Sequence, residues 1–155
     1  MKHLLSQTFL KRYPGPYAYL ASTDGVDATF CIECTTTGRS LASVYYWDDR
    51  IASELIARVV TVLLNEHAPT ESSRNDSSTK PLSEHEIAAF FGMYPGPFAV
   101  KAFHCDYRGP GIEIACDTSG ESALQIYNNT FRGHARLVSN SIARALKLLR
   151  QQSAT

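Results

Sequence analysis

The chain has 155 residues, of which 44% are apolar, and its 15 basic side chains balance its 15 acidic ones. A chain of this length and composition can bury one substantial hydrophobic core, so we expect a single domain. Zero formal charge argues against a general electrostatic attraction to nucleic acid or to a membrane surface, although local charged patches remain open.

The chain shows no pattern of a membrane or secretory segment. No stretch approaches 18 uninterrupted apolar residues, and the first residues lack the apolar run and cleavage site of a signal peptide. We therefore expect a soluble, cytoplasmic protein with no membrane partner. In that compartment we expect reduced thiols rather than disulfides at the four cysteines, Cys31, Cys34, Cys105 and Cys116.

The first half of the chain has the pattern of a helix, three strands and a second helix. The motif Tyr13-Pro14-Gly15-Pro16 is expected to end the first helix and turn the chain, because neither proline continues a helix and glycine accepts positive φ. The expected elements are a helix over 4–12, strands over 17–21, 28–35 and 41–47, and a helix with an apolar stripe over 51–63.

The second half repeats this order. Tyr94-Pro95-Gly96-Pro97 begins 81 residues after Tyr13, and Ile142-Ala143-Arg144 repeats Ile56-Ala57-Arg58. We predict a tandem duplication, with repeats over 1–67 and 83–155 joined by a flexible polar linker over 68–82. The expected elements are a helix over 83–93, strands over 98–103, 111–117 and 123–128, and a helix with an apolar stripe over 138–149.

The two repeats are expected to share one sheet. Strand side chains alternate between two faces, and one face is apolar in both copies, as in Phe30, Ile32 and Cys34 against Ile112, Ile114 and Cys116. We expect the helices to cover that face. The predicted fold is α+β, a mostly antiparallel six-stranded sheet of two α-β-β-β-α units with helices on one face and pseudo-twofold symmetry.

The opposite sheet face carries aromatic side chains among polar ones. Tyr45 and Tyr127 occupy equivalent strand positions on it, with Trp47 and Gln125 nearby. Tyrosine and tryptophan are enriched where a protein partner binds, although two half-exposed tyrosines that pack across strands give the same pattern. This face is therefore the candidate protein-binding surface, and a second copy of the chain is one possible partner.

The C-terminal segment is strongly basic. From Arg132 onward there are five basic residues and no acid, whereas 48–66 holds two basic residues and four acids. A solvated helix face explains such a run, and an acidic protein surface or a phosphate backbone is the functional alternative. The candidate anion-binding or nucleic-acid-binding residues are Arg132, Arg136, Arg144, Lys147 and Arg150. Segment 129–136, an insertion relative to the first half, is a further candidate.

Catalytic chemistry has little support in the sequence. No nucleophile-elbow, P-loop or dinucleotide motif occurs, so we predict no cofactor. Cys31 and Cys34 have the spacing of half a zinc site, but residues i and i+3 of a strand point to opposite faces and cannot share one ion. A small-ligand or enzyme site around His104, Cys105 and His134 is the remaining alternative.

These patterns lead to one main hypothesis. The chain is expected to be a non-enzymatic binding protein, an adaptor, chaperone-like protein or inhibitor, that recognises another protein through the open sheet face. Nucleic-acid binding through the basic segment and the sheet aromatics is the alternative. The expected arrangement is similar in topology to secretion-chaperone-like folds and, more loosely, to single-strand-binding proteins that pair a curved sheet with helices, which is a likeness of architecture alone.

Overall fold

Four helices and six strands make up the part of the chain that the computed structural model describes, which is residues 5–22, 29–45, 50–68, 80–105, 109–120, 122–127 and 134–153. The first half holds α1 (Gln7–Arg12), β1 (Tyr17–Ser22), β2 (Thr29–Cys34), β3 (Arg39–Tyr45) and α2 (Arg50–His67). The second half holds α3 (Glu84–Met93), β4 (Phe98–Cys105), β5 (Gly109–Cys116), β6 (Ser122–Tyr127) and α4 (His134–Ser153). Most of the predicted linker, 69–79, lies outside the described residues.

The repeated Tyr-Pro-Gly-Pro motif ends a helix in each half, as predicted. Tyr13 and Tyr94 are the C-caps of α1 and α3, and the backbone N–H of each donates to the carbonyl of the phenylalanine four residues earlier. Gly15 and Gly96 then turn the chain at a φ of 82° in both halves, a conformation that favours glycine. A capping box at Ser83 starts α3, at the residue where the sequence predicts this helix to begin.

The strands form two antiparallel meanders in the order β1-β2-β3-β6-β5-β4. Within each meander, neighbouring strands share five or more register pairs. Between the meanders, β3 and β6 share one described pair, Ser43 opposite Gln125. The prediction of a mostly antiparallel six-stranded sheet, built by duplication and pseudo-twofold symmetric, is therefore wrong, because the two meanders meet at a narrow contact between β3 and β6 with one described register pair.

The two halves also differ in the sizes of their elements. Helix α1 has 6 residues and α3 has 10, and the outer strands β1 and β4 have 6 and 8. Register shifts interrupt the pairing after Ile32 in β2 and after Ile114 in β5. Such bulges bend a strand and increase its twist, so they favour two curved meanders over one flat sheet. Descent of the halves from a duplicated unit stays a prediction.

The apolar sheet face predicted from the sequence is the buried one. Ile32, Cys34, Ile114 and Cys116 are fully buried, whereas Lys101 on the other face is exposed. Burial fades toward the far ends of the outer strands, where Ala21 and Ala102 are exposed although the sequence assigned them to the core face. The core is therefore centred under the helices and thins toward the two outer strands.

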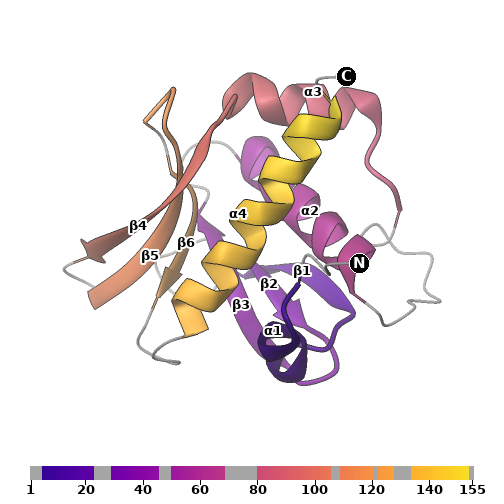
Figure 1. The fold of residues 1–155 in the computed structure, drawn as a ribbon, viewed down its shortest axis with the longest axis vertical. Helices are drawn as coiled ribbons and strands as arrows, with labels where there is room; N and C mark the ends of the chain where they lie inside the picture. Colours follow the sequence, from indigo (N-terminus) through magenta and orange to yellow (C-terminus); the bar gives the residue numbers. More distant parts are fainter. Residues whose placement is uncertain are drawn as a thin grey trace.

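The helices tie the two halves together. In Figure 1 the long helix α4 crosses α2, which it contacts, with α1 at one end of the molecule and α3 at the other. Helix α2 packs on β1 to β3 and α4 on β4 and β5, while α1 contacts α4 and α3 contacts α2. Each short helix therefore contacts the long helix of the other half, and the packing of α4 on β4 places α4 beside the turn at Pro95–Pro97.

Candidate functional site

The basic residues of α4 lie on its solvent side. Arg136, Arg144, Lys147 and Arg150 are all exposed, while the apolar stripe that includes Leu146 is buried. Helix α4 therefore has a cationic solvent face and a buried apolar stripe, and the predicted binding role of its cations stays a prediction. Arg132, the fifth predicted cation, lies outside the described residues, as does most of the predicted insertion over 129–136.

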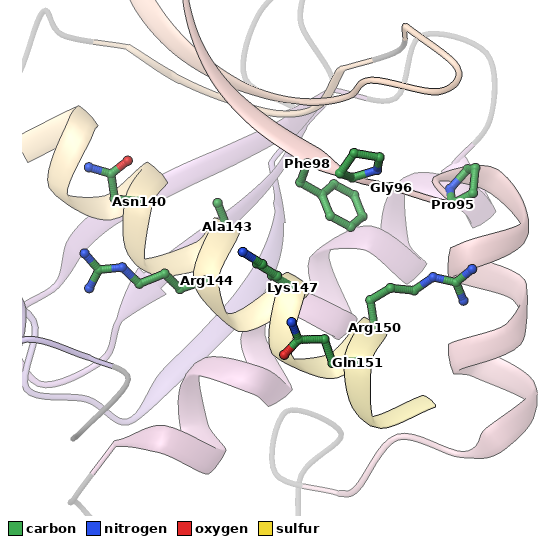
Figure 2. Close-up of a pocket in the computed structure, with 10 residues that line it drawn as sticks. Pro95, Gly96, Phe98, Asn140, Ala143, Arg144, Lys147, Arg150 and Gln151 are labelled. Carbon is green, nitrogen blue, oxygen red and sulfur yellow. The ribbon is translucent and has the colours of Figure 1, made fainter. Parts of the chain in front are cut away.

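Three of these cations border a groove between α4 and the turn that leads into β4. The groove has a volume of about 620 Å³. Figure 2 shows Lys147 on the side of α4 that is turned toward Phe98, while the side chains of Arg144 and Arg150 extend in opposite directions. The lining residues are Pro95, Gly96, Pro97, Phe98, Asn140, Ala143, Arg144, Lys147, Arg150 and Gln151. The groove therefore has apolar walls, a cationic border and no acidic side chain.

No carboxylate neutralises the cations of α4 among the described residues. The two ion pairs seen in that part of the chain join Arg58 to Glu86 and Lys101 to Asp117, away from α4. The Arg150 guanidinium lies 5.0 Å from the centre of the Phe91 ring, a cation–π contact in which no carboxylate takes part. An anionic ligand in this groove would therefore meet cations that no described carboxylate already occupies.

The first half shows what the corresponding arginine does when it has a partner. Arg58 and Arg144 hold the same place in the repeated Ile-Ala-Arg triplet, one on α2 and one on α4. Arg58 donates through Nε and NH2 to both carboxylate oxygens of Glu86 on α3. This two-bond geometry is the strong form of an arginine–carboxylate pair. Helix α1, the counterpart of α3, contains no acidic residue, so it offers Arg144 no equivalent carboxylate.

The hydrogen bond from Arg58 lowers the pKa of Glu86 to about 2 and raises the pKa of Arg58. A carboxyl group whose pKa is lower in the folded chain than in the unfolded chain stabilises the fold at pH values above its unfolded pKa. The contribution of Glu86 is therefore lost as the pH falls from about 4.5 toward about 2. We expect Glu86→Gln to lower the free energy of unfolding at pH 7 by about 1–2 kcal/mol and to flatten the acid limb of the stability profile. Urea unfolding at a series of pH values measures both effects, and an unchanged acid limb would contradict the pairing.

The predicted sheet-face site falls largely outside what the structure describes. Tyr45 lies on β3, and Gln125 and Tyr127 lie on β6, which places their backbones at the contact between the two meanders. The side chains of these residues, and all of Trp47, lie outside the described part. Protein recognition through this face therefore stays a prediction.

The alternative site around His104, Cys105 and His134 also stays a prediction. His104 is exposed near the end of β4, and the side chains of Cys105 and His134 lie outside the described part. Within the described residues, no three His, Cys, Asp or Glu side chains gather in a way that could hold a metal ion. Cys34 is buried and Cys31 lies 3.9 Å from Ser43 Oγ, so the two thiols have different surroundings, as expected for i and i+3 of a strand.

The sequence pointed to the cations but not to the groove wall. The sequence predicts a turn and the start of a strand over 95–98, and the structure has both. The same residues form one wall of the groove because α4 lies beside them, which the sequence does not show. The helix side of the groove is visible in the sequence of α4. A continuous face outside the apolar stripe is formed there by residues spaced three or four apart, Asn140, Ala143, Lys147 and Gln151.

Comparisons of this chain with family models, with curated proteins and with solved structures found no match. Among the described residues, no helix has the length and apolar character needed to cross a membrane. The chemistry of the groove is therefore the basis for a functional proposal.

Proposed function

We propose that the protein is a non-enzymatic binding protein that recognises an acidic segment of another protein in the groove between α4 and Pro95–Phe98. One observation carries the proposal: the groove is bordered by Arg144, Lys147 and Arg150 and contains no acidic side chain. Charge complementarity at such a border sets the choice of partner and the rate of encounter.

The walls of the groove favour a peptide over a phosphate backbone. Phe98, Ala143 and the two prolines give it an apolar surface that an aliphatic or aromatic side chain fills. Its volume of about 620 Å³ suits a few side chains rather than a long strand of nucleotides. The balanced charge of the whole chain, 15 against 15, also gives no broad positive field for a nucleic acid.

Selection from a random peptide library tests the proposal and requires no candidate partner. A phage library of random dodecapeptides is selected on the immobilised protein, and the enriched sequences are expected to contain Asp or Glu next to an apolar residue. A synthetic copy of an enriched peptide, labelled with fluorescein, is then titrated by fluorescence anisotropy at several salt concentrations. Affinity is expected to fall as salt rises, because charge pairs at an exposed border are screened.

Charge-reversal variants locate the site. Arg144→Glu combined with Lys147→Glu is expected to weaken binding about 10- to 100-fold, since each reversal replaces an attraction by a repulsion. Arg136→Glu is a matched control on the same helix, and Lys11→Glu is a control in a second basic groove beside α1. Both controls are expected to change affinity less than about twofold, because neither residue lines the α4 groove.

Three results would overturn the proposal. Enriched peptides without acidic residues would remove its chemical basis. Equal binding by the double variant, or equal loss in the Lys11→Glu control, would place the site elsewhere. Tight, strongly salt-dependent binding of a labelled 20-nucleotide oligothymidylate, with no acidic peptide selected, would assign the cations of α4 to nucleic acid.

A further inference from the structure

One residue of the groove, Phe98, presents backbone groups as well as a side chain. It begins β4, which stands last in the strand order and is therefore an edge strand. The Asp117 N–H donates to the Pro97 carbonyl at 2.9 Å, and the next register pair joins Phe98 to Cys116. Antiparallel pairs alternate between bonded and non-bonded, so the N–H and C=O of Phe98 point away from β5 toward the open edge.

The first half has the same geometry with the edge closed. The Thr35 N–H donates to the Pro16 carbonyl at 2.9 Å, so Tyr17, the counterpart of Phe98, also turns its backbone groups outward. There the Asn65 side chain of α2 accepts from the Tyr17 N–H at 2.8 Å and donates to the Tyr17 carbonyl at 2.9 Å. One amide group therefore satisfies both outward groups of the edge residue.

The second half lacks this closure. Gln151 occupies the position on α4 that Asn65 occupies on α2, each seven residues after the arginine of the Ile-Ala-Arg triplet. Gln151 is exposed and lines the groove with Phe98, and no hydrogen bond joins the two residues in the described part of the chain. The groove therefore contains an edge-strand donor and acceptor where the first half contains a bonded asparagine.

We propose that the partner segment binds in an extended conformation and pairs its own backbone with the N–H and C=O of Phe98, while its acidic side chains reach Arg144 and Lys147. This inference rests on the proposed function, because it assumes that the groove takes an acidic peptide. Addition of a strand at a sheet edge gives affinity through main-chain hydrogen bonds and selectivity through side-chain contacts.

The first half indicates the chemistry of this occupant. There an amide group of α2 fills the edge position at Tyr17, and the carboxylate of Glu86, which α3 of the second half contributes, fills the arginine position at Arg58. An extended acidic peptide is a ligand that supplies both an amide group and a carboxylate. The same two requirements argue against a nucleic acid, whose sugar–phosphate backbone has no amide to exchange with Phe98.

N-methyl scanning of the selected peptide tests the backbone pairing. Each peptide N–H is replaced in turn by N–CH3, which removes one donor and keeps all side chains and charges. We expect one position to lose about 10-fold or more in affinity, because a hydrogen bond lost beneath the bound peptide leaves the Phe98 carbonyl without a partner. Its neighbours in the extended peptide, whose N–H groups point the other way, are expected to tolerate the change.

Gln151→Asn gives an independent readout on the protein. Asparagine at this position is expected to bond to Phe98 as Asn65 bonds to Tyr17, and to weaken the peptide about 10-fold with no change of charge. Gln152→Asn is the matched control, because it makes the same change at an exposed neighbour that does not line the groove, and it is expected to bind the peptide as the unchanged protein does. Slower amide exchange of Phe98 in the peptide complex, measured by NMR on ¹⁵N-labelled protein, is the third expected result.

The results of these experiments distinguish the strand pairing at Phe98 from the acidic-peptide binding on which it rests. If every N-methyl peptide binds like the parent while affinity still depends on Arg144 and Lys147, the acidic-peptide function stands and the strand pairing is wrong. If binding never depends on acidic residues, both are wrong. A dimer in analytical ultracentrifugation that Gln151→Asn dissociates would assign the β4 edge to a second copy of the chain and overturn the inference.

Discussion

Replacement of Phe90 by Ala is expected to lower the free energy of unfolding by about 3–5 kcal/mol, a large part of the total stability of a domain of this size. Phe90 is fully buried on α3, and its ring centre lies 5.2 Å from that of Phe91, 5.6 Å from Tyr94 and 6.2 Å from Phe98. Its removal leaves a cavity between three rings that belong to α3, its C-cap and β4, so we expect the site to collapse only in part.

Urea unfolding monitored by circular dichroism measures this loss. Phe90→Leu is expected to cost less, since it keeps most of the apolar volume, and Ile51→Ala is the control at an apolar residue that is 83% exposed. A loss below about 1 kcal/mol in Phe90→Ala would contradict a packed aromatic core at the start of β4. Because Phe98 packs against Phe90, the same variant is also expected to weaken peptide binding in the groove.

Local rules of helix and turn formation account for most of the structure that the sequence predicted. The caps at Ser83 and Tyr94 and the glycine turn at Gly96 depend on residues close in the chain, and each is found where expected. The buried sheet face was also predictable from local pattern, because strand side chains alternate between the two faces with period two. The register shift after Ile114 falls near the end of β5, so the alternation holds along most of that strand.

The sheet was mispredicted because its joining strands depend on long-range geometry. The sequence shows equivalent strands in the two halves, but it does not show how far β3 and β6 remain paired, for which the structure gives one described register pair. A repeat in the sequence therefore predicted shared local structure, which is present, and overpredicted the symmetry of the whole. The narrow contact between β3 and β6 is a property of twist that residue patterns do not display.

The sequence predicts the charges of the candidate site but not the groove that these charges border. The cations of α4 form a run without acids that is visible in the sequence alone. The groove forms because Phe98 on an edge strand and Gln151 on α4 lie on opposite sides of one space. These residues are more than 50 positions apart in the chain, so their proximity is not visible in the sequence. Comparison of the two halves supplies the missing signal, because it shows which partners Arg144 and Phe98 lack in the described structure.

Replacement of Asn65 by Leu is expected to lower the free energy of unfolding by about 2–4 kcal/mol, although leucine has the same number and branching of side-chain heavy atoms. The change removes the acceptor for the Tyr17 N–H and the donor for the Tyr17 carbonyl, bonds of 2.8 and 2.9 Å that close the edge of β1. We also expect the leucine side chain to exclude water from the Tyr17 N–H and carbonyl. Each of these two groups then lacks a hydrogen-bond partner, which lowers the stability of the folded state.

The counterpart variant Gln151→Leu is expected to change the free energy of unfolding by less than about 0.5 kcal/mol, because Gln151 is exposed and makes no bond to Phe98 in the described structure. Thermal and urea unfolding of the two variants under identical conditions give the comparison. Equal losses would mean that Gln151 closes the β4 edge as Asn65 closes the β1 edge, and the backbone of Phe98 would then be unavailable to a partner. A large loss in Asn65→Leu alone would mean that the two halves share one edge geometry and that only the first half closes it internally.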